Sequence, residues 1–243
     1  MWEDQISTIT KWLTLEQPVN FVLFNVYQPA NYIRTFGPSG EEAAAAMQKV
    51  DQMIARLVEQ LQRNNLYEET NIVLTGAHGF AEITADKVFD ISQYLPDKNS
   101  HVLVGHSPVL NIFHSENQDL NIYASLSKGP RDEKYDLYIH KDIPEEYHYK
   151  DNGRVGTMTL VAKEGFAFSD VWQDFKELNA EHHRKDLLEN SYGIAGYDNS
   201  LESMQSLIIL HGPNIKPLQV GNMRQETEFI FHLSGPGPHQ AKD

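Results

Sequence analysis

The sequence reads FVLFNV at residues 21–26 and NIVLT at residues 71–75, and these two apolar runs decide the fold class. Each run is almost continuously apolar, as expected for a strand that is covered on both faces of a sheet. Between them, apolar residues recur at helical spacing and indicate a long amphipathic helix that starts at Glu41 (Met47, Val50, Ile54, Leu57, Val58 and Leu61). A strand, a crossover helix and a second strand form a βαβ unit. The sequence therefore predicts an α/β fold with a mostly parallel sheet flanked by helices.

The rest of the chain is expected to alternate shorter elements with turns. Helical spacing near the N-terminus predicts a short helix that ends near Pro18 (Trp2, Ile6, Ile9 and Leu13). We interpret residues 170–196 as a long charged insertion and expect a final helix around residues 229–233. Further strands are expected at 102–104, 109–113, 137–139, 158–162 and 206–210. Residues 1–233 are interpreted as one domain and residues 234–243 as a flexible tail.

The composition is that of a globular domain with an acidic surface. The 243 residues carry a formal net charge of −14, which makes binding to nucleic acid or to an anionic membrane unfavourable. The absence of cysteine excludes disulfides, thiolate metal sites and a cysteine nucleophile. No apolar stretch is long enough to span a bilayer, and residues 1–4 lack the features of a signal peptide. We therefore expect no nucleic-acid partner and no membrane span, and a chain that stays where it is made.

Two short segments follow the predicted strands at 21–26 and 71–75, and a third precedes the strand predicted at 206–210; α/β proteins hold their ligands at the carboxyl ends of strands. They read QPANYIRTFGP at residues 28–38, TGAHGF at residues 75–80 and GIAGYDN at residues 193–199. Three further landmarks are GHSPV at 105–109, DIPEEYHY at 142–149 and HGP at 211–213. A set of six landmarks in order is a far more specific signal than any one of them alone.

In this order the segments resemble the catalytic domain of the ectonucleotide pyrophosphatase/phosphodiesterase family, within the alkaline-phosphatase-like superfamily. The family pattern Glu-Pro-Asp-x-x-Gly-His-x-x-Gly-Pro falls on residues 28–38 without a gap. The family pattern Val-x-Thr-Ser-Asp-His-Gly-Met is similar to residues 73–80. The resemblance covers nearly all of the chain and implies a partial phosphodiesterase-like domain that lacks the N-terminal part of the usual domain.

The resemblance implies hydrolysis of phosphodiesters by two zinc ions and a threonine nucleophile. One zinc would be bound by Asp, His and a later His, and the corresponding positions here are Ala30, Arg34 and Ala195. The other would use an Asp-His pair, for which this chain has Ala77 and His78. Family members place the nucleophile upstream of the matched segments, so no residue of this chain is assigned as catalytic. Because one imidazole cannot replace three or four ligands, we expect no zinc or other cofactor.

Two of these positions keep a polar side chain, and each has two interpretations. His78 is either a remnant ligand or a loop histidine that hydrogen-bonds to nearby backbone, which the ligand count favours. Arg34 is either a solvated surface arginine or a fixed positive charge that still contacts a phosphate, because guanidinium suits that bidentate geometry. His182 and His183 are adjacent on the chain and are interpreted as a solvated pair, and Asp198 with Asn199 is expected to shape a turn.

The resemblance therefore predicts a catalytically inactive homologue of nucleotide pyrophosphatase/phosphodiesterases that acts as a binding or interaction module. Its partner would be an unidentified protein or a small phosphate-containing ligand. The alternative is a metal-dependent hydrolase of nucleotides or phospholipid-type diesters, with substitute ligands such as Glu82, Asp86 and Asp198 or with a missing N-terminal segment. An incomplete reading frame is a third interpretation. The family is extracellular or membrane-anchored, but the sequence leaves the localisation of this chain open. Loss of an early strand is also expected to leave apolar surface uncovered.

Overall fold

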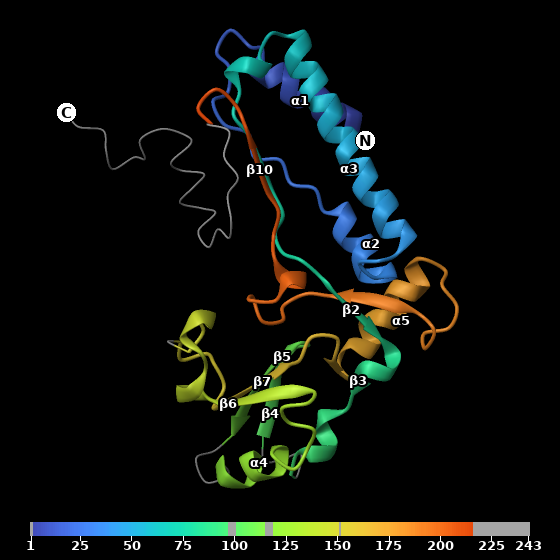
Figure 1. The fold of residues 1–243 in the computed structure, drawn as a ribbon, viewed down its shortest axis with the longest axis vertical. Coiled ribbons are helices and arrows are strands. Elements are labelled where there is room, and N and C mark those ends of the chain that lie inside the picture. Colours follow the sequence, from blue (N-terminus) through green and yellow to red (C-terminus); the bar gives the residue numbers. More distant parts are fainter. Residues whose placement is uncertain (1, 97–100, 115–118, 151, 216–243) are drawn as a thin grey trace, which may run out of the picture. The chain divides into compact units, whose positions relative to one another are not determined.

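The computed structural model of the chain describes residues 2–96, 101–114, 119–150 and 152–215. The described residues form two compact units, the first within residues 2–26, 48–77 and 206–215 and the second within residues 27–47 and 78–205. The chain contains both helices and strands (Figure 1), which confirms the α/β class. None of the described helices is both long and apolar enough to cross a membrane.

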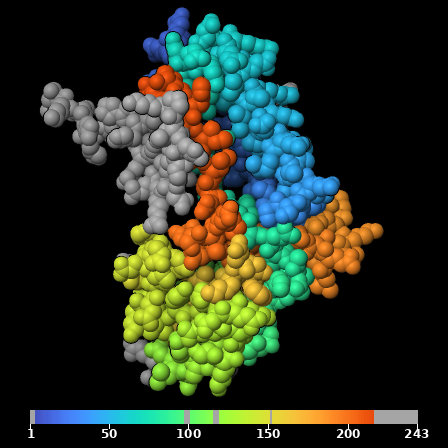
Figure 2. Space-filling model, in the orientation of Figure 1, coloured from blue at the N-terminus to red at the C-terminus, as the bar shows by residue number. Residues whose placement is uncertain are grey.

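Two helices supply the core of the first unit. Helix α1 spans Trp2–Leu13 and helix α3 spans Glu41–Arg63, as the helical spacing predicts. Residues 6, 9 and 53 are buried between them, because the apolar stripes of the two helices face each other. The remaining faces of α3 carry exposed charged and amide side chains. Figure 2 shows α3 at the surface of the molecule.

The first unit also contains a two-stranded antiparallel ladder. Strand β1 (Ile72–Thr75) pairs with strand β10 (Ile208–His211), and Ile72 lies opposite His211. Gly76 continues the pairing, since its N–H donates to the carbonyl of Leu207 at 2.8 Å. Both strands are predicted from the sequence, but the expected parallel partner of β1 is replaced by an antiparallel one.

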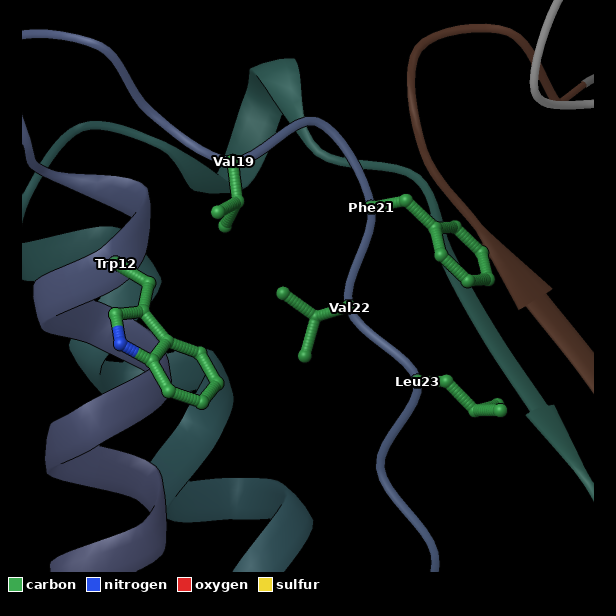
Figure 3. A pocket seen from close by; sticks show the side chains of 5 residues that line it. All are labelled: Trp12, Val19, Phe21, Val22 and Leu23. Atoms are coloured by element: carbon green, nitrogen blue, oxygen red, sulfur yellow. The ribbon is translucent and has the colours of Figure 1, made fainter.

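Residues 21–26 form no strand, so the predicted βαβ unit is not present among the described residues. The segment alternates between exposed and half-buried side chains, as an extended chain does. Its half-buried members Val22, Phe24 and Val26 pack on the core of the first unit, whereas Phe21 and Leu23 are exposed (Figure 3). An apolar run predicts an extended, half-covered segment, but a strand also requires backbone hydrogen bonds to a neighbour.

A four-stranded sheet dominates the second unit (Figure 1). Its strands follow the order β4-β5-β7-β6 and all three ladders are antiparallel. The bounds are His101–His106 for β4, Val109–His114 for β5, Tyr135–Ile139 for β6 and Met158–Ala162 for β7. Each contains a strand predicted from the sequence, and β7 is buried along its whole length. The sheet is therefore the centre of the larger hydrophobic core.

Shorter elements complete the second unit. They are helices α2 (Gln28–Phe36), α4 (Asp119–Leu126) and α5 (Val171–Glu181), the antiparallel pair β2 (Ala81–Thr84) with β9 (Ser191–Ile194), and the parallel pair β3 (Val88–Phe89) with β8 (Ala167–Phe168). Single 3-10 turns cover Tyr67–Glu69 in the first unit and Ala85–Lys87, Ile91–Tyr94, His140–Asp142, Glu145–Tyr147 and Glu202–Met204 in the second. Of the six ladders described here, β3 with β8 is the parallel one.

The interpretation of residues 170–196 as a charged insertion is wrong. These residues contribute α5 and β9 to the second unit. Val171, Phe175 and Tyr192 are buried in the larger core. Charged residues on the outer face of α5 conceal the apolar stripe in the sequence. The helix predicted around residues 229–233 and the tail at 234–243 lie outside the described residues, and the single domain over residues 1–233 stays a prediction.

Candidate functional site

Helix α2 carries two of the five positions that the sequence singles out. Pro29 stands in its first turn, where the fixed φ of proline favours helix and no backbone N–H is needed. The helix ends at Phe36 and is followed by Gly37, whose φ of 78° suits glycine. Ala30 and Arg34 are four residues apart and therefore share one face of α2.

A close backbone contact fixes α2 on strand β9. A Cβ atom added at Gly193 would lie 2.5 Å from the carbonyl oxygen of Ile33, in the middle of α2. Only glycine allows this approach. Ala195 lies two residues beyond Gly193 and directly follows β9. The contact at Gly193 therefore holds the segment before Ala195 against helix α2, which carries Ala30.

Arg184 secures the C-terminal end of α2. Its guanidinium donates a hydrogen bond to the carbonyl of Thr35 and lies 4.8 Å from the ring centre of Phe36 and 5.4 Å from that of Tyr192. A cation at the C-terminus of a helix is stabilising because the last carbonyls carry partial negative charge. Sequence reasoning missed Arg184, since its role depends on a carbonyl 149 residues away.

His182 belongs to the same cluster and is not solvated as predicted. Its ring centre lies 5.7 Å from that of Tyr32 and 5.3 Å from that of Phe36, both on α2. Its Nε2 atom is buried and has no hydrogen-bond partner among the described residues. His183 is exposed, with a φ of 54°, because the chain turns sharply after α5. The solvated-pair interpretation therefore holds for His183 only.

Arg34, unlike Arg184, makes no side-chain hydrogen bond within the described part of the chain. Its side chain is exposed on the last turn of α2, and within the described part of the chain it has no hydrogen-bond or ion-pair partner. Ala30 and Ala195 are both half-buried and offer no lone pair. Positions 30, 34 and 195 thus present one unpaired guanidinium and two methyl groups among the described residues.

His78 lies in an exposed loop of the second unit. Because a carbonyl only accepts, the Nδ1–H of His78 donates to the carbonyl of Gly79 at 2.9 Å. The ring also lies edge-on to Phe80, with centres 4.9 Å apart. These contacts agree with the interpretation of His78 as a loop histidine bonded to nearby backbone. Ala77 belongs to the first unit and has no donor side chain.

The loop after His78 makes close backbone contacts with residues 203 and 204. The N–H of Gly79 donates to the carbonyl of Met204 at 3.2 Å, and a Cβ atom at Gly79 would lie 1.9 Å from the carbonyl oxygen of Ser203. A side chain at position 79 is therefore excluded by backbone. Backbone packing is therefore sufficient to explain the glycine at position 79.

The candidate substitute ligands have other partners. Asp198 accepts hydrogen bonds from the hydroxyl of Tyr147 at 2.9 Å and from the N–H of Ser200 at 2.8 Å, which is the turn predicted from the sequence. Burial alone would raise the pKa of Asp198, but these hydrogen bonds outweigh it and lower that pKa. Burial and the bond to Asp198 both raise the pKa of Tyr147, so its hydroxyl stays protonated and donates.

Asp86 and Glu82 also do not converge with His78 on a common centre. Asp86 accepts from the hydroxyl of Thr84 at 2.5 Å, and this hydrogen bond is the main reason that its pKa is lowered. Glu82 is exposed on β2 and is paired with Gly193 of β9 across the antiparallel ladder. Within residues 2–96, 101–114, 119–150 and 152–215, no three His, Asp or Glu side chains are placed to hold a metal ion.

These residues do not fit a two-zinc centre. Zinc needs three or four lone-pair donors, and the five positions provide one imidazole, three methyl groups and a guanidinium that is always protonated. The part of the chain that the structure describes therefore supplies no ligand set for zinc at these positions.

Comparisons with known proteins identify the relatives of the chain. The family model described as type I phosphodiesterase / nucleotide pyrophosphatase matches residues 1–186. The chain is 27% identical to human ectonucleotide pyrophosphatase/phosphodiesterase family member 5 over 87% of its length and 41% of that protein. It is 28% identical to human bis(5'-adenosyl)-triphosphatase ENPP4 over 98% of its length and 49% of that protein.

A solved structure shows the same relationship. An inactive variant of murine ectonucleotide pyrophosphatase/phosphodiesterase 5, in complex with AMP, superposes with a TM-score of 0.71 at 28% identity, covering 88% of this chain and 52% of that chain. The chain spans about half the length of the relatives that it matches. The match over most of the chain, together with the ordered motifs, shows that the chain belongs to the type I phosphodiesterase / nucleotide pyrophosphatase family.

Proposed function

We propose that this chain is a catalytically inactive homologue of the nucleotide pyrophosphatase/phosphodiesterases that acts as a binding or interaction module. The observation that carries the proposal is the set of side chains at positions 30, 34, 77, 78 and 195, of which His78 alone can donate a lone pair to a metal. The framework around these positions supports a binding role, because α2, β9 and the loop at Gly79 are held by close contacts.

Arg34 gives the module a chemically defined contact. Its guanidinium is exposed, always charged and unpaired within the described part of the chain. A phosphate group accepts two parallel hydrogen bonds from such a fork, and the bond is charge-assisted. Since the murine relative was solved with AMP, a nucleoside monophosphate is the first ligand to test against Arg34.

AMP at millimolar concentration should raise the thermal unfolding midpoint of the wild-type chain, because a ligand that binds only the folded state stabilises it. Arg34→Gln should lose most of that increase, and phosphocholine should compete if the phosphate is the recognised group. Arg154→Gln is the matched control, because Arg154 is also exposed and lies in the same unit. An AMP effect that is equal in both variants would exclude Arg34 as the phosphate contact.

The absence of catalysis is tested with bis-p-nitrophenyl phosphate in the presence of added zinc. We expect the wild-type chain and His78→Ala to release p-nitrophenol at the same rate, close to that of buffer, since the described residues contain no set of metal ligands. A wild-type rate clearly above that of His78→Ala would show that His78 supports chemistry and would overturn the proposal.

A further inference from the structure

The turn at residues 152–155 of the second unit contains the only Asn-Gly pair of the sequence. The N–H of Val155 donates to the carbonyl of Asn152 at 3.1 Å, and this hydrogen bond closes the turn. The side chain of Asn152 folds forward over the turn, because its Oδ1 atom accepts a hydrogen bond from the N–H of Arg154 at 2.9 Å. The side-chain amide carbon of Asn152 is therefore held beside the peptide group that joins this residue to Gly153.

Gly153 leaves its backbone nitrogen accessible. A Cβ atom added at Gly153 would meet nothing within 4 Å, and the φ of this residue lies outside the left-handed region, so the turn itself does not require glycine. Within the described part of the chain, the N–H of Gly153 has no hydrogen-bond partner. The nitrogen that follows Asn152 is thus neither shielded by a side chain nor engaged elsewhere.

The N–H of Arg154 lies where negative charge would develop if this nitrogen attacked Asn152. Attack on the side-chain amide carbon turns the Oδ1 atom of Asn152 into an oxyanion. A backbone N–H at 2.9 Å stabilises that oxygen, as the donors of an oxyanion hole do. The hydrogen bond from Arg154 therefore both positions the side chain and lowers the barrier to attack.

We propose that Asn152 is a modification site, at which the backbone nitrogen of Gly153 attacks the side-chain amide and converts Asn152 to aspartate and isoaspartate. The new bond from nitrogen to Cγ closes a cyclic imide, and the side-chain nitrogen leaves as ammonia with the proton from Gly153. Water then opens the imide at either carbonyl. The overall reaction consumes one water, releases one ammonia and adds one negative charge beside the exposed Arg154.

The fold disfavours the same reaction at two other described asparagines that precede a small residue, serine. The N–H of Ser200, which follows Asn199, donates to the carboxylate of Asp198 at 2.8 Å and is not available for attack. The side-chain amide of Asn190 donates to the carbonyl of Lys185 at 3.0 Å, which holds it away from the serine that follows. Asparagine is a thermolabile residue in general, but these contacts protect both positions.

Peptide mapping by mass spectrometry tests the proposal on the folded wild-type chain, kept for several weeks at mildly alkaline pH. We expect the mass increase of deamidation, and isoaspartate, at Asn152. Gly153→Ala should slow the conversion at least about tenfold, because a methyl group then shields the attacking nitrogen. Arg154→Gln is the matched control, since it keeps the backbone N–H and should convert at the wild-type rate. Both substitutions are at exposed positions, so both variants should keep the wild-type circular dichroism spectrum.

The same chain unfolded in urea separates the effect of the turn from that of the Asn-Gly pair. Asn152 should convert at least as fast in the folded chain as in urea, whereas Asn190 and Asn199 should convert about tenfold or more slowly when the chain is folded. Slower conversion of Asn152 in the folded chain than in urea would overturn the proposal. So would conversion of Asn152 no faster than that of Asn190 and Asn199 in the folded chain, or a wild-type rate in Gly153→Ala.

Discussion

Replacing Tyr192 with alanine should lower the free energy of unfolding by about 3–5 kcal/mol, the usual cost of deleting a buried aromatic side chain. Tyr192 is completely buried and its ring stacks on Phe175 with centres 3.8 Å apart and an interplanar angle of 5°. Its hydroxyl lies 3.1 Å from the Oδ1 atom of Asn179, to which it donates. The variant would therefore lose both the packing that joins α5 to β9 and a buried hydrogen bond.

Urea denaturation followed by circular dichroism measures this loss. Tyr192→Phe should cost less, about 1–2 kcal/mol, since it removes only the hydroxyl and leaves Asn179 without that donor. Tyr27→Ala is the control at an exposed position and should stay within about 0.5 kcal/mol of wild type. A cost below about 1 kcal/mol for Tyr192→Ala would contradict the packing described for β9.

Restoring the ligands of one metal position should create zinc binding. The triple variant Ala30→Asp, Arg34→His, Ala195→His places a carboxylate and two imidazoles at the positions that the family motif assigns to one zinc. Residues 30 and 34 share a face of α2, and residue 195 follows the strand that contacts α2 through Gly193. Three lone-pair donors with an open fourth position suit zinc.

We expect the triple variant to retain about one equivalent of zinc per chain after dialysis, where wild type retains almost none. The control variant Ala30→Asn, Arg34→Gln, Ala195→Gln has side chains of similar size, without a carboxylate or an imidazole, and should remain free of zinc. Equal zinc content in the two triple variants would show that the motif has been aligned with the wrong residues.

The parts of the fold that the sequence predicts correctly are those with a local signal. Helices α1 and α3 follow from apolar spacing, and the strands of the four-stranded sheet follow from short apolar runs between turns. The predicted parallel partner of β1 is wrong, because strand propensity does not specify which neighbouring strand forms the hydrogen bonds. Residues 21–26 were assigned to a strand for the same reason.

The candidate site shows the same division between local and distant information. The positions of Ala30, Arg34, Ala77, His78 and Ala195 come from motif spacing alone, and the turn at Asp198 comes from local hydrogen bonding. Arg184 and His182 could not be assigned to the α2 anchor, because their partners are far away in the sequence. The close contact between Gly193 and Ile33 likewise depends on packing between two distant segments.

The most direct test of the central claim is the metal content of the purified wild-type chain, measured by inductively coupled plasma mass spectrometry after dialysis against zinc-containing and then zinc-free buffer. With one potential ligand among the five family positions, we predict far less than one equivalent of zinc per chain. About two tightly held equivalents, lost in His78→Ala, would show an intact two-metal centre and contradict the account.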